Sequence, residues 1–72
     1  MFRADGMRFV IYLNDHEPAH LHVYGDGEAR IDITTLRVMS VRGMGQRDVA
    51  RALATATEYR SYFLQRWTEI HG

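Results

Sequence analysis

Hydrophobic and polar residues alternate along the first half of the chain, and this period of two predicts half-buried β-strands. The dipeptide Asp5-Gly6 stands between two such runs and is typical of a tight hairpin turn. Gly25-Asp26-Gly27 separates the next two runs and predicts a second hairpin. A weaker apolar stretch then predicts an edge strand. The predicted strands of this small antiparallel sheet cover residues 2–4, 7–13, 20–24, 28–33 and 36–41.

From about residue 46 the apolar residues recur at helical spacing, after Gly43-Met44-Gly45 has broken the chain. One apolar stripe, interrupted by Arg60, continues to about residue 70 and predicts one long helix. A second row on this helix carries only small side chains. We expect this row either to lie over the sheet, to face water or to contact a partner. The stripe contains Val49, Leu53, Ala56, Phe63, Trp67 and Ile70, and the small-residue row contains Ala50, Ala54, Thr57 and Ser61.

These patterns predict a single α+β domain over residues 1–72. A sheet of three to five strands with two hairpins, over about 2–41, packs against one C-terminal helix over about 46–70. A chain of 72 residues builds a small core and is marginally stable on its own. Because there is no cysteine, additional stability must come from packing, self-association or a metal held by histidine.

Nine acidic residues balance nine basic ones, so the overall charge does not indicate a nucleic-acid-binding protein. RNA binding would need a local basic patch. All the basic residues are arginine, whose planar guanidinium suits carboxylate and phosphate. No apolar run approaches the roughly 18 residues of a membrane span. With no cysteine, the sequence predicts a cytoplasmic protein that does not associate with a membrane.

Strand register decides which side chains share a face of the sheet, since a slip of one residue exchanges the two faces. With a three-residue loop in the second hairpin, His20 lies across from Asp32 and is close enough for a histidine–carboxylate contact. His22 lies across from Arg30. The predicted core face contains Phe9, Ile11, Leu13, Leu21, Val23, Ala29, Ile31 and Ile33, and the predicted ligand or partner face contains Arg8, Tyr12, His16, His20, His22, Arg30 and Asp32.

Three of the four histidines lie within residues 16–22, which is the strongest indication of a site in the chain. Neutral imidazoles of His16, His20 and His22 would bind Zn²⁺ or a similar divalent ion, with Asp32 as a fourth ligand or an orienting group. The spacing allows this arrangement but does not require it.

A metal-free catalytic site is the second interpretation of the same residues. A histidine, His20 or His22, held by Asp32 would act as a general base while Arg30 stabilises a phosphate, which suffices for RNA cleavage without a cofactor. The chain offers no compelling nucleophile, so the sequence does not decide whether the protein is an enzyme.

The third interpretation is structural. Asp15 and His16 would stabilise the loop before Pro18, and the other two histidines would be cross-strand partners on a wet face. We expect the His20 and His22 side chains to point to solvent. Packing of either against Trp67 or Phe63 would contradict the predicted site.

The order of these motifs resembles the bacterial family catalogued as domain of unknown function 4160. The resemblance rests on Asp5-Gly6, on the block from Asn14 to Val23, on an acidic–basic strand and on a terminal helix with Trp67. The block of the family reads Asn-Asp/Glu-His-x-Pro-Pro-His-x-His-Val, and here Ala19 replaces the second proline.

The resemblance implies no established activity. Members are often encoded beside another small domain, an arrangement similar to toxin–antitoxin pairs, which implies a small protein partner encoded nearby. The leading interpretation is therefore an interaction module that binds such a partner or a second copy of itself. The alternative is a histidine-dependent RNA-cleaving toxin or a metal-dependent hydrolytic one.

Overall fold

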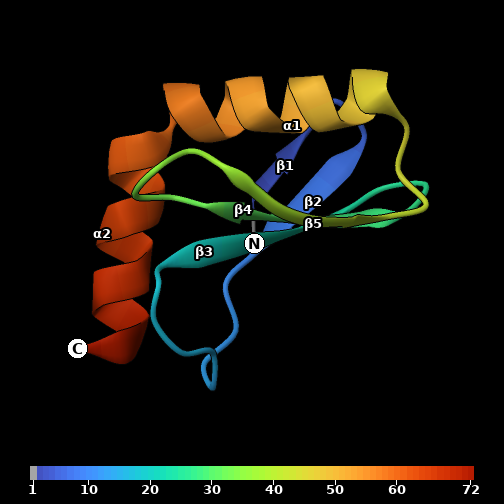
Figure 1. Ribbon diagram of the computed structural model, residues 1–72. Coiled ribbons are helices and arrows are strands. Elements are labelled where there is room, and N and C mark those ends of the chain that lie inside the picture. The colour runs from blue at the N-terminus through green and yellow to red at the C-terminus, as the bar shows by residue number, and fades with distance from the viewer. Residues whose placement is uncertain (1) are drawn as a thin grey trace.

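The computed structural model describes residues 2–72 and contains an antiparallel sheet of five strands in the order β1-β2-β3-β4-β5 (Figure 1). Each strand pairs with its neighbour in the sequence, as the hairpin turns predict. The α+β fold is confirmed. The strands are β1 (Phe2–Ala4), β2 (Met7–Val10), β3 (His20–Tyr24), β4 (Glu28–Asp32) and β5 (Val38–Arg42).

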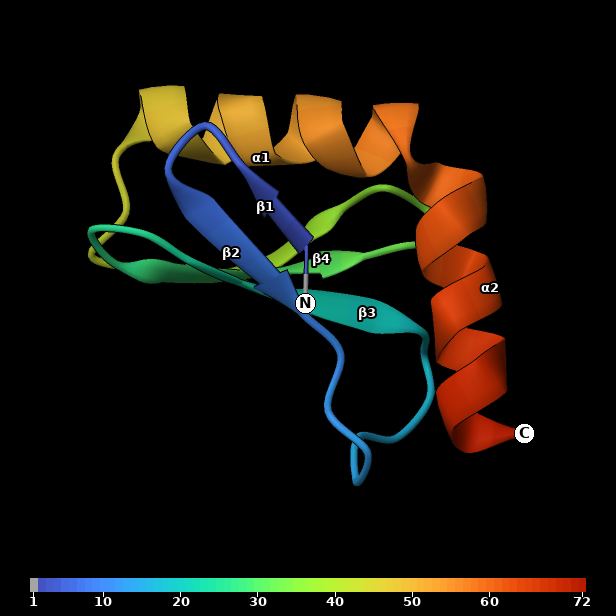
Figure 2. The ribbon, with the colours of Figure 1, turned by 180° about the vertical axis from the view of Figure 1, so that it is seen from behind.

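Two helices follow the sheet where the sequence predicted one. Helix α1 (Gln46–Glu58) lies across one face of the sheet, and α2 (Arg60–His71) turns away from it and runs down past one end (Figures 1 and 2). The break is at Tyr59. A straight helix over residues 46–70 would be about 38 Å long, whereas the longest extent of the whole molecule is 33 Å. The break therefore keeps the end of the apolar stripe in contact with the sheet.

Arg60, the polar residue in the apolar stripe, fastens the start of α2 to the turn between β4 and β5. Its Nε donates to the carbonyl of Ile33 at 2.9 Å, and its Nη2 donates to the carbonyl of Thr34 at 3.0 Å. The same turn is closed by Asp32, whose Oδ1 accepts from the backbone N–H groups of Thr34 at 2.7 Å and Thr35 at 2.9 Å. The polar interruption of the stripe thus has a structural role.

The core lies between the sheet and the two helices, and it contains most of the predicted core face. Leu13 is the exception, because it is 78% exposed, whereas Ile11 is partly buried against the core. Strand β2 ends at Val10, and the chain then turns between Tyr12 and Asp15, so the strand alternation stops before Leu13. The buried apolar residues are Met7, Phe9, Ala19, Leu21, Val23, Ala29, Ile31, Ile33, Met44, Ala52, Ala56, Phe63 and Trp67.

The predicted register of the second hairpin is confirmed, with His20 opposite Asp32 and His22 opposite Arg30. Because residues that lie opposite one another share a face, the register defines two rows on the side away from α1. We call this side the polar face. One row crosses all five strands with Arg3, Arg8, Tyr24, Glu28 and Arg42, and the next contains Val10, His22, Arg30 and Ser40.

The small-residue row of the predicted helix is exposed at Ala50, Ala54, Thr57 and Ser61. It therefore does not lie over the sheet, and it faces either water or a partner. Within residues 2–72, neither helix combines the length and the apolar character that crossing a membrane requires.

Candidate functional site

The loop between β2 and β3 lies below the sheet in the views of Figures 1 and 2. The contacts of Asp15 with His20 and His22 place its carboxylate at the polar face. A tight turn holds this carboxylate: the Tyr12 N–H donates to Asp15 Oδ2 at 3.3 Å, and the Asp15 N–H donates to the Tyr12 carbonyl at 3.2 Å. Asp15 Oδ2 lies 3.0 Å from His22 Nε2 and 3.5 Å from His20 Nε2. The ligand atoms of this Asp15–His20–His22 cluster all lie within 4.8 Å of one another.

The tautomer of the neutral His20 ring follows from its hydrogen bond to Pro18. Nδ1 lies 2.7 Å from the carbonyl oxygen of Pro18, which accepts but cannot donate, so Nδ1 carries a proton. Nε2 of the neutral ring then directs a lone pair toward the carboxylate of Asp15. Two acceptors facing each other at 3.5 Å repel unless a proton or a metal cation lies between them. With His20 only 6% exposed, water screens this repulsion little.

The spacing of the cluster suits a divalent ion. Two ligand atoms bound to one tetrahedral Zn²⁺ lie about 3.4 Å apart at ordinary bond lengths, close to the 3.0 and 3.5 Å observed from Asp15 Oδ2. A backbone carbonyl on the far nitrogen of a ligating histidine is the usual orienting contact, and Pro18 supplies it for His20. The arrangement can therefore hold a metal ion with small side-chain movements.

The indole ring of Trp67 packs beside His20 of the cluster. Its ring centroid lies 5.5 Å from that of His20, and its Nε1 donates to Glu17 Oε1 at 3.2 Å. His71 stacks on Trp67 at 3.8 Å between centroids, and its Nδ1 donates to the Trp67 carbonyl. The expectation that His20 points to open solvent is thus wrong, and the predicted site of two solvent-exposed histidines is not formed. Because α2 descends past the end of the sheet, Trp67 reaches the polar side and half-encloses the cluster.

Of the other predicted site residues, some join the cluster and some do not. His22 joins the cluster, whereas His16 is exposed and takes no part in it. Asp32 lies opposite His20 in the register, but its Oδ1 caps the following turn instead of contacting the imidazole. The predicted His20–Asp32 contact is therefore not formed, and Asp15 provides the carboxylate.

Tyr12, Tyr24 and Arg8 extend the polar face beyond the cluster. The Tyr12 ring stands edge-on to His22 with 4.8 Å between centroids, and its hydroxyl lies 2.8 Å from the hydroxyl of Tyr24. This hydrogen bond, followed by burial, raises the pKa of Tyr24 to about 12. Arg8 lies over the Tyr24 ring at 5.3 Å, which is cation–π distance.

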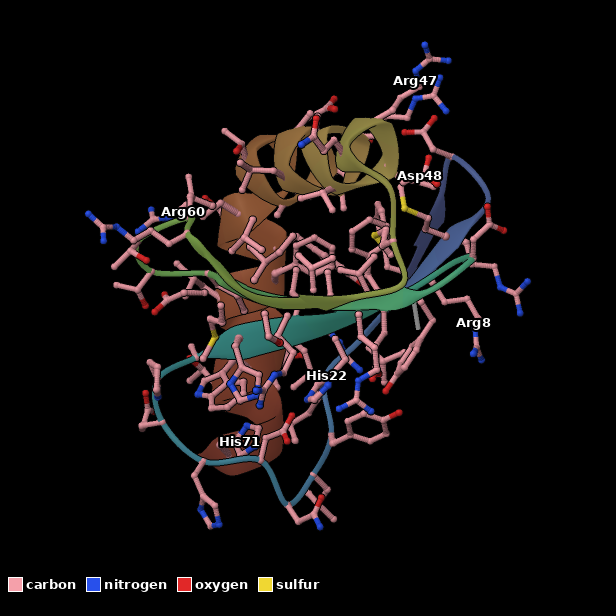
Figure 3. The ribbon with its side chains drawn as sticks, turned by 45° about the vertical axis from the view of Figure 1, so that its right-hand side comes forward. Arg8, His22, Arg47, Asp48, Arg60 and His71 are labelled. Carbon is pink, nitrogen blue, oxygen red and sulfur yellow. The ribbon has the colours of Figure 1, made fainter. Side chains whose placement is uncertain are left out.

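A hollow of about 340 Å³ adjoins the cluster on the polar face. Arg30 is positioned there by Ser40, whose Oγ accepts from Arg30 Nε at 3.0 Å. Figure 3 shows Arg8, His22 and His71 on the underside of the sheet, whereas Arg47 lies on the opposite side at α1. The hollow is lined by His22, Glu28, Arg30, Ser40, Val41 and Arg42, so His22 belongs to both the hollow and the cluster.

Sequence reasoning missed the roles of Asp15 and Trp67. Asp15 lies in the histidine-rich block, but it is a loop residue, and the period-two argument orients only strand residues. Trp67 was predicted to be in the core, and only the helix break brings it beside His20.

Comparison with known proteins places this chain in a family. Residues 6–68 match the family described as Domain of unknown function (DUF4160), and this range contains Asp15, both cluster histidines and Trp67. No curated protein and no solved structure matches the chain. Because the match covers most of the 72 residues, it confirms the resemblance that the motifs indicated. The chain belongs to the DUF4160 family.

Proposed function

We propose that this protein binds a divalent metal ion, with Zn²⁺ as the first choice, through Asp15, His20 and His22, and that the bound ion supports hydrolysis. The observation that carries this proposal is the orientation of His20. Its Nδ1–H is committed to Pro18, so in the neutral imidazole the Nε2 lone pair faces a carboxylate oxygen at 3.5 Å. A cation between these two acceptors turns a repulsive contact into an attractive one.

The number of protein ligands favours a reactive ion over a structural one. Structural zinc sites are closed by four protein ligands, whereas catalytic sites use three and leave a position for water. Zn²⁺ makes such a water acidic enough to ionise near neutral pH. It would supply the nucleophile that the side chains do not offer. The exposed side-chain fractions of Asp15 and His22, 17% and 16%, leave the cluster accessible from the polar face.

The test is Zn²⁺ affinity in matched pairs of variants, measured by calorimetry on protein stripped of metal. Asp15→Asn should weaken binding by more than about 100-fold, since loss of even an outer-shell partner costs about 10- to 100-fold. Asp32→Asn makes the same chemical change outside the cluster and should bind like the wild type. In a second pair, His22→Ala should weaken Zn²⁺ binding, whereas His16→Ala, outside the cluster, should bind like the wild type.

Binding should also weaken as the pH falls, because protons compete with the metal for the imidazoles. Equal Zn²⁺ affinity in Asp15→Asn and Asp32→Asn would refute the proposed ligand set. Failure of the wild-type protein to bind Zn²⁺, Mn²⁺ or Ni²⁺ at millimolar concentration would refute the metal centre itself.

Binding of a protein partner is the second candidate function, and it is the activity expected of one member of a toxin–antitoxin-like gene pair. It is favoured by strand β5, the edge strand that follows β4, where Met39 and Val41 are 41% and 46% exposed. Edge strands with exposed apolar side chains are sites of strand addition by other chains.

Co-purification with the product of the neighbouring gene tests this candidate. Val41→Glu should reduce recovery of the partner, whereas Leu13→Glu, at an apolar residue 78% exposed in the β2–β3 loop, should not. Equal recovery with both variants, or no recovery with the wild type, would count against partner binding through β5.

A further inference from the structure

The hollow beside the cluster has the chemistry of an anion site. Two guanidinium groups, Arg30 and Arg42, line it together with one carboxylate, Glu28. Its volume of about 340 Å³ is at the lower end of the range of ligand pockets, about 300 to 1,000 Å³. The size suits a phosphate group with its ester substituent.

Arg30 is held in a defined orientation. Its Nε donates to Ser40 Oγ at 3.0 Å, which leaves the two terminal nitrogens to serve as a fork for paired acceptor oxygens. Arg42 reaches the same hollow, and its side chain is 87% exposed and lies 3.9 Å from the Glu28 carboxylate. An ion pair this exposed is weak, so Arg42 remains available to a ligand with stronger charge.

The hollow adjoins the proposed metal centre through a shared residue. His22 lines the hollow, and its Nε2 also belongs to the Asp15–His20–His22 cluster. Arg30 lies directly opposite His22 in the strand register. A group held by the arginines is therefore next to the metal ligands.

We propose that this hollow is a phosphate-binding subsite and that the substrate class of the metal centre is a phosphate ester. The assignment of a substrate rests on the proposed function, whereas phosphate binding itself does not require the ion. In the hydrolysis, the oxygen of water forms a bond to phosphorus and the ester P–O bond breaks. The leaving alcohol oxygen takes a proton from the water. Water is the co-reactant, so neither an oxidant nor a reductant is needed.

Phosphate esters reach such a site as small nucleotides or as a nucleic-acid chain, and the arms of the experiment separate the two sources. Metal-stripped protein is titrated with a fluorescently labelled single-stranded oligoadenylate, and unlabelled oligoadenylate, AMP and inorganic phosphate are then added as competitors. Displacement of the oligonucleotide by AMP at similar concentrations identifies a mononucleotide-sized ligand. Displacement only by unlabelled oligonucleotide identifies an RNA chain, and both outcomes support a phosphate subsite.

Arg30→Gln should weaken binding of the tightest probe by about 10-fold or more, as expected for loss of a charge-assisted hydrogen-bond pair. Arg42→Gln tests the same subsite if the first variant fails to fold, as judged by circular dichroism. Arg47→Gln is the matched control, because it removes one positive charge at α1 on the opposite side (Figure 3). Its affinity should stay within about 2-fold of the wild type, since a distant exposed charge is screened by salt.

Equal losses in Arg30→Gln and Arg47→Gln would overturn the subsite and leave only non-specific charge attraction. Absence of binding to all three probes at millimolar concentration would overturn it as well. The Asp15→Asn variant separates the two proposals, since it should lose Zn²⁺ and retain phosphate binding. Failure of the metal centre and failure of the phosphate subsite are therefore distinguishable.

Discussion

Replacing Trp67 with alanine tests whether the indole ring that packs beside His20 is part of the stable core. Trp67 is 5% exposed, and truncating a buried tryptophan costs about 3 to 5 kcal/mol of the free energy of unfolding. Stacking with His71 at 3.8 Å and the donor bond to Glu17 at 3.2 Å place the expected cost toward the upper end. A domain of 72 residues has a total stability of about 4 to 11 kcal/mol. The variant should therefore lose much of its stability.

Urea unfolding followed by far-ultraviolet circular dichroism measures this loss, since the chain has a single tryptophan and the variant has no indole fluorescence. Trp67→Phe keeps an aromatic ring in the stack but removes the bond to Glu17, and should cost about 1 to 3 kcal/mol. Gln65→Ala, at an exposed position of α2, should stay within about 0.5 kcal/mol of the wild type. An unchanged urea midpoint in Trp67→Ala would refute the packing of α2 described above.

Three further perturbations test separate parts of the structure. The hydrogen bond to Tyr12 raises the pKa of Tyr24 from 10.0 to about 12, so it contributes stability that is fully present below pH 10 and is lost as the pH rises through about 12. In Tyr12→Phe, tyrosinate absorbance should show Tyr24 ionising closer to 10.0, and an unchanged titration would contradict the pairing. Arg60→Met should cost about 1 to 3 kcal/mol in urea unfolding, because two carbonyls of the β4–β5 turn lose a charged donor. Gly27→Ala should destabilise the fold by about 1 to 3 kcal/mol, since a Cβ there would overlap the backbone carbonyl of Arg42; a melting temperature equal to that of the wild type would show that the loop yields easily.

The sheet could be predicted from the sequence because period two, turn residues and hairpin length all constrain the same register. A slip of one residue would have turned Leu21 and Ile31 out of the core, so the register with His20 opposite Asp32 follows from burial. The helix break could not be predicted. The apolar spacing continues across Tyr59 with Arg60 as its one polar residue, and a straight helix of this length would exceed the 33 Å longest extent of the molecule.

The sequence predicted the part of the candidate site that lies on strand β3 but not the part that lies in the β2–β3 loop. His20 and His22 share a face because they are two residues apart on β3. Asp15 is brought to them by a turn closed through its own backbone and carboxylate, and a loop has no period from which a direction can be derived. Strand register indicates only which backbone positions are opposite, so it could not show that Asp32 turns to Thr34 and Thr35.

The order of the strands has a consequence for how this chain folds. Since every strand pairs with the strand before or after it, the sheet requires only the closure of short loops, and structures rich in local contacts fold fast. The packing of α2 depends on distant contacts, such as Phe2 with Phe63 and Trp67 with Glu17, which close much longer loops at a higher entropic cost. We therefore expect a transition state in which the hairpin carrying His20 and His22 is formed while α2 is still undocked. In that state His20 lacks its indole neighbour, so the cluster acquires its final enclosure only in the last step of folding.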